Sequence, residues 1–222
     1  MTTPTAYARF IASMGLESRR EAEGYDLGAL DGMTAAECSE VEARLMAQTP
    51  LSWRDLQALA RLGTPRALAC LRREVESGSA HGRLEAAVQL HLRGERIPLD
   101  DVLEEALLAG LREETLLAET LRAIETLKRT RMVHPLLRAT LQGRGESAAL
   151  CAAMVCFLRG KAQSGFDWSL RPFFLRFNTK DRMARRMAFA ELCGRVGEDP
   201  VPYLSLSSQP GVAAYHDSRS GS

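Results

Sequence analysis

Apolar residues recur every three or four positions along most of this chain, which is the spacing of one side of an α-helix. The pattern is clearest in residues 52–77. There Leu56 and Leu59 share one side of a first helix, and Leu68 and Leu71 share one side of a second. A helical hairpin with an apolar side on each helix cannot bury both sides alone. The pattern therefore predicts that similar hairpins pack beside it.

Residues that begin and end helices mark the boundaries of this hairpin. Gly63 predicts the end of the first helix, because glycine readily adopts the left-handed conformation of a helix C-terminus. Thr64 is a typical N-cap for the second helix, and Pro65 suits its first position. Upstream, Thr34 and Glu37 have the spacing of a capping box, which predicts a helix to about Ala47.

The same criteria predict helices over much of the remaining chain. The expected segments are residues 4–14, 83–93, 98–111, 113–128, 133–141, 146–159, 167–175 and 180–195, with Pro172 limiting or bending the segment that contains it. Turns at the centre of successive helix pairs fall near Gly63, Glu95, Arg129, Lys161 and Val196, at intervals of 32–35 residues. Such intervals are close to those of helical-hairpin solenoids, and no segment alternates as a strand would. The sequence predicts an all-α protein, an α-solenoid of about four to five antiparallel helical hairpins.

Two helical segments have unusual apolar patterns. The run from Ala148 to Leu158 is apolar throughout, but eleven residues are too few for a membrane span, which needs about 20. We expect it to be a buried core helix. The helix of residues 180–195 has Met183 and Met187 on one side and Phe189 on another, which predicts that it is sandwiched between neighbours.

The predicted organisation has three parts. Residues 1–48 form an N-terminal helical capping segment, residues 49–205 form the repeats, and residues 206–222 form a flexible tail rich in Ser, Gly and Pro. The N-terminus has no basic region followed by an apolar one, so we expect no signal peptide.

Composition fits this picture, with 45% hydrophobic, 26% charged and only 6% aromatic residues. The formal net charge is +1, but charge is distributed unevenly. Residues 100–125 carry eight acids against two bases, and residues 159–195 carry nine bases against three acids. Opposite fields on different parts of the surface favour docking onto charged partners, although solvated helix surfaces are charged in any case.

The five cysteines are odd in number and have no C-x-x-C pair, and each falls within a helical pattern: Cys38, Cys70, Cys151, Cys156 and Cys193. Cysteine in such a setting behaves as a small buried hydrophobe. Free thiols fit a reducing cytoplasm better than a secreted, disulfide-bonded protein. We therefore predict a cytoplasmic protein that does not associate with membranes.

Two segments resemble bacterial HEAT-type repeats, namely Leu59–Ala67 and Arg186–Gly197, where a helix ending at a glycine turn is followed at once by another. Gly24–Leu30, with Met33 and the Glu-rich helix after it, is similar to the N-terminal segment of some small HEAT-like bacterial proteins. The resemblance covers about residues 24–200. It implies a non-catalytic protein-binding module, and the preferred hypothesis is an immunity protein that neutralises a cognate toxin from the same operon. A general assembly scaffold is an alternative.

The sequence contains no recognisable catalytic or metal-binding pattern. HEAT-like hydroxylases that bind iron use His-Glu pairs, and none of the four histidines precedes a glutamate. His81 and His91 are ten residues apart, which does not place two ligands on one helix turn. Neither a nucleophile elbow nor a phosphate-binding glycine loop is present. We therefore expect no catalysis, no cofactor and no metal.

A nucleic-acid-binding protein resembling the HEAT-like DNA glycosylases is the main alternative. Trp53 with Asp55 and Asp167 with Trp168 suggest the aromatic and acidic residues of such enzymes, although core tryptophans explain them as well. The corresponding basic surface would contain Arg171, Arg176, Lys180, Arg182, Arg185 and Arg186. The near-neutral total charge makes nucleic acid an improbable partner, since phosphate contacts dominate such binding.

Acidic residues give the more specific hypothesis of a partner-binding surface. They stand at the beginnings of two predicted helices: Asp100, Asp101, Glu104, Glu105, Glu113 and Glu114. Acids at helix N-termini are favoured by the helix dipole, which is a structural explanation. They also suit a basic toxin such as a nuclease, because charge complementarity speeds association.

Overall fold

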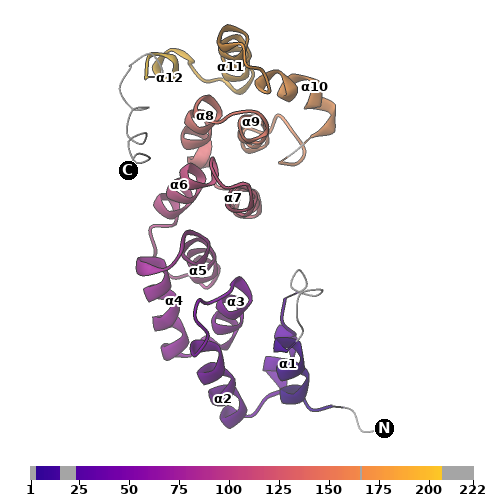
Figure 1. Cartoon of the computed structure of the whole chain (residues 1–222), viewed down its shortest axis with the longest axis vertical. Coiled ribbons are helices and arrows are strands. Elements are labelled where there is room, and N and C mark those ends of the chain that lie inside the picture. The colour runs from indigo at the N-terminus through magenta and orange to yellow at the C-terminus, as the bar shows by residue number, and fades with distance from the viewer. Residues whose placement is uncertain (1–3, 16–23, 166, 207–222) are drawn as a thin grey trace, which may run out of the picture. The chain divides into compact units, whose positions relative to one another are not determined.

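The structure, a computed structural model, describes residues 4–15, 24–165 and 167–206 (Figure 1). The chain divides into two compact units, the first ending at Val102 and the second beginning at Leu103. The boundary falls inside the helix α6 (Leu99–Gly110). The predicted capping segment of residues 1–48 and the first repeats thus belong to one unit. The predicted tail lies outside the described residues from position 207 onward.

The all-α prediction is confirmed for the residues that the structure describes, which contain helices and no strands. Among these helices, none is both long enough and apolar enough to cross a membrane.

The described residues of unit 1 form α-helices and one 3₁₀ helix. In chain order these are α1 (Ala6–Met14), η2 (Leu27–Gly32), α2 (Ala35–Met46), α3 (Trp53–Leu62), α4 (Pro65–Ser77), α5 (Ala80–Leu92) and the first residues of α6. α5 packs against both α3 and α4, and α2 packs against α3. Its core includes Phe10, Val41, Leu45, Leu56, Leu59, Leu71 and Leu90.

The turn between α3 and α4 has the predicted geometry. Gly63 is left-handed, with φ 63°, and its N–H donates to the carbonyl of Leu59 at 3.0 Å. The Thr64 hydroxyl oxygen then accepts the N–H of Ala67 at 3.0 Å and caps α4. The Thr34 capping box that begins α2 is also confirmed.

Two contacts from other helices hold this turn in place. The Thr64 hydroxyl donates to the carboxylate of Glu42, a buried residue of α2, so the cap of α4 is tied to α2. The Arg93 guanidinium, which follows α5, donates to the carbonyl of Ala60 at 2.7 Å. That carbonyl lies in the last turn of α3, where carbonyl groups lack partners within the helix. The turn between two helices is thus stabilised from both α2 and the end of α5.

Unit 2 begins with the larger part of α6. It continues with α7 (Glu114–Leu127), η3 (Thr130–Met132), α8 (Val133–Gln142), α9 (Glu146–Leu158), η4 (Trp168–Leu170), α10 (Arg171–Phe174), η5 (Leu175–Phe177), α11 (Arg182–Val196) and α12 (Val201–Leu206). α9 contacts α7, α8, α10, η5 and α11, and its residues 151–156 are all buried. The prediction of a buried core helix is confirmed, because a helix that is apolar all round must have neighbours on every side.

The segment around Pro172 is divided into short helical pieces, η4, α10 and η5. Pro172 lacks an N–H and is tolerated only in the first turn, which is where it lies in α10. This agrees with the prediction that proline limits the helix.

The short helix α12 was not predicted. Its Tyr203 is buried and packs edge-on against Phe189 of α11, with ring centroids 5.8 Å apart. On its other side the Tyr203 hydroxyl lies in hydrogen-bonding contact with Nδ1 of His134 in α8. These long-range contacts hold α12 against α8 and α11.

The prediction that α11 is sandwiched between neighbours is wrong. Phe189, Leu192 and Cys193 are fully buried, but Met183 and Met187 are 66% and 62% exposed. α11 packs on α8, α9 and η5 through one side only. The apolar pattern was correctly assigned to two sides, but in the described part of the chain only one side has neighbours.

Candidate interaction surfaces

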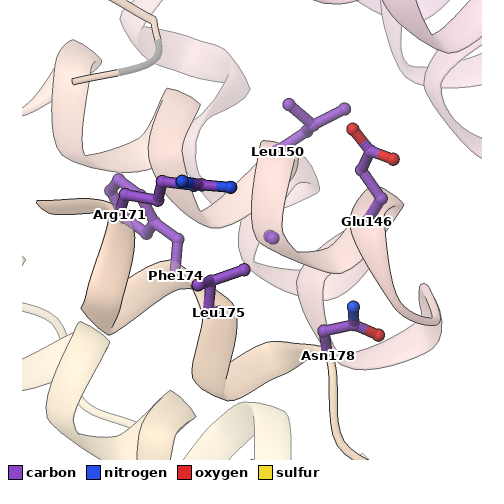
Figure 2. Close-up of a pocket in the computed structure, with 7 residues that line it drawn as sticks. Glu146, Leu150, Arg171, Phe174, Leu175 and Asn178 are labelled. Carbon is purple, nitrogen blue, oxygen red and sulfur yellow. The ribbon is translucent and has the colours of Figure 1, made fainter. Parts of the chain in front are cut away.

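The structure contains a pocket of about 430 Å³ between α9 and the α10–η5 segment (Figure 2). Its apolar lining comes from Ala149 and Leu150 of α9 and from Phe174 and Leu175. Figure 2 shows the Arg171 side chain on one side of the pocket and the carboxylate of Glu146 on the other. The pocket therefore combines an apolar surface with one group of each charge. Such a site can receive an apolar side chain with polar neighbours, and sequence reasoning did not find it.

The exposed side of α11 is the second candidate. Met183 and Met187 are one helical turn apart, so their side chains lie on the same side of the helix. The opposite side is held firmly by its buried residues, and the Asp181 carboxylate caps the helix by accepting the N–H groups of Met183 and Ala184. The two methionines are thus presented on a fixed helix.

An acid whose charge is compensated lies one helical turn after Met187 on α11. Glu191 of α11 is ion-paired with Arg176 of η5 and with Arg195 at 2.7 Å. Hydrogen bonds from Arg176, and then from Arg195, lower the pKa of Glu191. The Arg195 guanidinium also lies 4.4 Å from the ring centroid of Phe173. The only acid within α11 is therefore fully engaged with arginines of its own unit.

The predicted basic residues have different neighbours. Arg176 pairs with Glu191, Arg171 lines the pocket, and Arg185 donates to the carbonyl of Gly143 at 3.4 Å. Lys180 and Arg186 have no ion-pair partner within the described residues, and Arg182 stands at the first position of α11. These cations come from α10, η5, α11 and the segment between η5 and α11.

The predicted acidic residues occupy the two ends of α6. Asp100 and Asp101 lie in its first turn, with Glu104 and Glu105 in the next. Glu113 follows its other end, where its N–H donates to the carbonyl of Gly110 at 3.1 Å, and Glu114 begins α7. The helix rises about 1.5 Å per residue, so roughly 15 Å separates the two groups. Glu104 is paired with Arg138 of α8 at 2.8 Å, and Asp101, Glu105, Glu113 and Glu114 are exposed residues.

The acids of the two aromatic and acidic pairs, Asp55 and Asp167, make hydrogen bonds that stabilise local structure. Asp55 is buried, forms the capping box of α3 with Ser52, and accepts a hydrogen bond of 2.8 Å from the Tyr25 hydroxyl. Burial and this hydrogen bond raise the pKa of Tyr25 to about 12. Asp167 accepts hydrogen bonds from the Ser169 N–H and hydroxyl, which lower its pKa. The Trp168 side chain lies outside the described part, and Trp53 is exposed beside Gly24.

Histidines and acids do not gather into a metal site within the residues that the structure describes. His134 stacks on Tyr203 with ring centroids 6.2 Å apart, and its Nδ1 lies 4.0 Å from the Glu198 carboxylate. Glu198 in turn is ion-paired with Arg159. The group links α8, the end of α9 and the segment before α12, so its observable role is to attach α12.

The cysteines are unpaired thiols, and all but Cys38 are buried. Burial raises the pKa of Cys151 and Cys193 to about 12 and that of Cys156 to about 11. We expect iodoacetamide at pH 8 to modify the folded chain at the half-buried Cys38 alone. The other four thiols are buried, and the thiolate, which is the reactive form, is disfavoured in Cys151, Cys156 and Cys193. In urea all five thiols should react, and mass spectrometry of both samples counts them. Rapid alkylation of Cys151 in the folded chain would contradict this expectation.

Comparison with known proteins returns no match. No protein-family model matches the chain, and neither a curated protein nor a solved structure matches it significantly.

Proposed function

We propose that this chain is a non-catalytic protein-binding module whose helix pairs are HEAT-like repeats of an α-solenoid. The exposed methionine side of α11 is the observation that carries the proposal. Monomeric proteins bury most large apolar side chains of a core helix, and clusters left exposed tend to mark interaction sites. In helical-repeat proteins, such a side is normally covered by the next hairpin or replaced by a polar capping surface.

The methionine side chain is well suited to binding a protein partner. Its unbranched, polarisable side chain adapts to differently shaped surfaces, and it is used frequently on binding surfaces for that reason. The pocket beside α9 supports the same proposal, since an apolar depression with charged edges accepts an anchoring side chain of a partner. Both features are on unit 2.

The specific form of the proposal is a cytoplasmic immunity protein whose partner is a cognate bacterial toxin from the same operon. The acidic residues of α6 and α7 support it, because Asp101, Glu105, Glu113 and Glu114 are all exposed. A basic toxin would approach such a surface faster than a neutral one. In this form the acidic residues steer the encounter, and apolar surfaces provide most of the affinity.

The experiment is co-purification of the chain with the product of the adjacent gene, followed by titration calorimetry. Replacing both Met183 and Met187 with glutamine is expected to weaken binding about tenfold or more, which corresponds to about 1.4 kcal/mol. Leu92→Gln is the matched control, because Leu92 is 59% exposed on α5 in unit 1. It should leave the affinity unchanged.

Three further results decide the remaining parts of the proposal. If Asp101→Lys with Glu105→Lys leaves both the association rate and the affinity unchanged, the acidic residues are not a partner site. If the neighbouring product does not bind at all, the immunity role is excluded. If it binds and the methionine variant binds equally well, α11 is not the contact surface.

A further inference from the structure

The exposed methionines belong to a longer row on α11. Met183, Met187, Ala190 and Gly194 are spaced by four, three and four residues, which keeps all four within a narrow stripe of the helix. At about 1.5 Å per residue the row is roughly 16 Å long, or about three helical turns. It is therefore long enough to accommodate one side of a short helix.

The shape of the row changes along its length. Methionines occupy its N-terminal half, and small residues occupy its C-terminal half. Apart from its chain neighbours and the backbone of its own helix, no heavy atom of the described residues lies within 4 Å of the position that a Cβ would take on Gly194. The backbone of a partner can thus approach closely at Gly194, while its larger apolar side chains contact the methionines.

The edges of the row are cationic. Arg182 and Arg186 follow one edge of the row by helical geometry. On the other edge stands Glu191, whose charge is compensated by Arg176 and Arg195. Residues 159–195 as a whole carry a net charge of +6, so a second copy of the same surface would be repelled.

We propose that this row, the α11 surface, binds an amphipathic acidic helix of a protein partner. The apolar side of that helix covers Met183, Met187, Ala190 and Gly194, and its Asp or Glu residues face the arginines at the edges. This inference rests on the proposed protein-binding function and names the partner element that α11 recognises. Helix-in-groove recognition of this kind places apolar residues at spacings of three and four on the bound helix.

An apolar centre favours a protein helix over nucleic acid. Phosphate contacts require cations along the path of the backbone, whereas here the central row carries no charge. Base stacking would require exposed aromatic rings, and the row contains methionine, alanine and glycine only.

The test measures by fluorescence anisotropy how tightly the full chain binds two synthetic helical peptides of about 16 residues. The acidic peptide has leucine and alanine at spacings of four, three and four and glutamate on both flanks; the basic peptide has lysine in place of every glutamate. We expect the acidic peptide to bind at least about tenfold more tightly than the basic one. Its binding should weaken as salt rises from about 50 to 500 mM, since exposed charges are screened.

Variants of the chain assign the binding to the α11 surface. Met183→Gln with Met187→Gln should weaken binding of the acidic peptide about tenfold, and Arg186→Glu should remove its advantage over the basic peptide. Arg66→Glu, an exposed change in unit 1, is the matched charge control and should change nothing. Circular dichroism of each variant verifies that the helices remain folded.

Several outcomes would overturn the inference. These are equal binding of both peptides, binding of neither, displacement of the acidic peptide by a DNA duplex, and concentration-dependent self-association that buries α11. The protein-binding proposal has a separate readout. The methionine variant could fail to bind the natural partner while the wild-type chain does not bind the acidic peptide. In that case the protein-binding proposal is retained and an acidic helix is excluded as the partner element.

Discussion

Replacing Gly110 with alanine is expected to lower the free energy of unfolding of unit 2 by about 3 kcal/mol. A Cβ at this position would lie 2.7 Å from the backbone nitrogen of Leu117 and 2.8 Å from its Cα. Gly110 ends α6 and Leu117 lies in α7, so one methyl group forces two helix backbones apart. Alanine is a better helix former than glycine by about 1 kcal/mol, and this gain is too small to compensate.

Thermal unfolding followed by circular dichroism measures the effect, with an expected fall in melting temperature of roughly 10 °C. Gly194→Ala is the control, because this glycine is also helical but a Cβ there enters open space. It should raise stability by about 0.5–1 kcal/mol through helix propensity alone. If both alanines stabilised the chain, the close approach of α6 and α7 at Gly110 would be wrong.

Replacing Gly63 with alanine should lower the free energy of unfolding of unit 1 by about 2–3 kcal/mol. Two effects add. A left-handed conformation costs a residue with a Cβ about 1–2 kcal/mol. The added Cβ would also meet the Arg93 guanidinium and displace it from the carbonyl of Ala60, with the loss of a charged hydrogen bond worth about 1 kcal/mol or more.

Gly94 separates these two effects. Its φ of 81° is also left-handed, but nothing in the described structure lies within 4 Å of its would-be Cβ. Gly94→Ala should therefore cost only the backbone strain, about 1–2 kcal/mol. Urea unfolding of both variants, and of Gly63→Ala in an Arg93→Ala background, completes a double-mutant cycle. Equal losses at Gly63 and Gly94 would show that the Arg93 contact contributes nothing.

Much of the secondary structure could be predicted because its determinants are local. The caps at Thr34 and Thr64 accept N–H groups three residues away, so the residue pattern that predicts them lies within one helical turn. The all-apolar pattern of residues 148–158 likewise implies burial whatever the neighbours are. α12 escaped prediction because its stability depends on His134, 69 residues before its partner Tyr203.

The candidate surfaces were less predictable because exposure depends on what is packed nearby. The two-sided pattern of α11 indicates where apolar residues lie but not whether another helix covers them. From the pattern alone Met183 and Met187 are therefore predicted to be buried, whereas they are exposed. The acidic residues show the same difficulty, since the pairing of Glu104 with Arg138 spans 34 positions. Asp55 beside Trp53 suggests an acidic residue of a glycosylase-like site, but its spacing from Ser52 is also that of a capping box, which is its role in the structure.

The burial of four of the five thiols has a practical consequence for studying the chain. A maleimide dye is expected to attach to the wild-type protein at one position, Cys38 in unit 1, with no cysteine to be removed beforehand. The proposed ligand binds in unit 2, on a helix without a reactive thiol. Dye emission during titration with the acidic peptide would therefore report whether an event in one unit reaches the other.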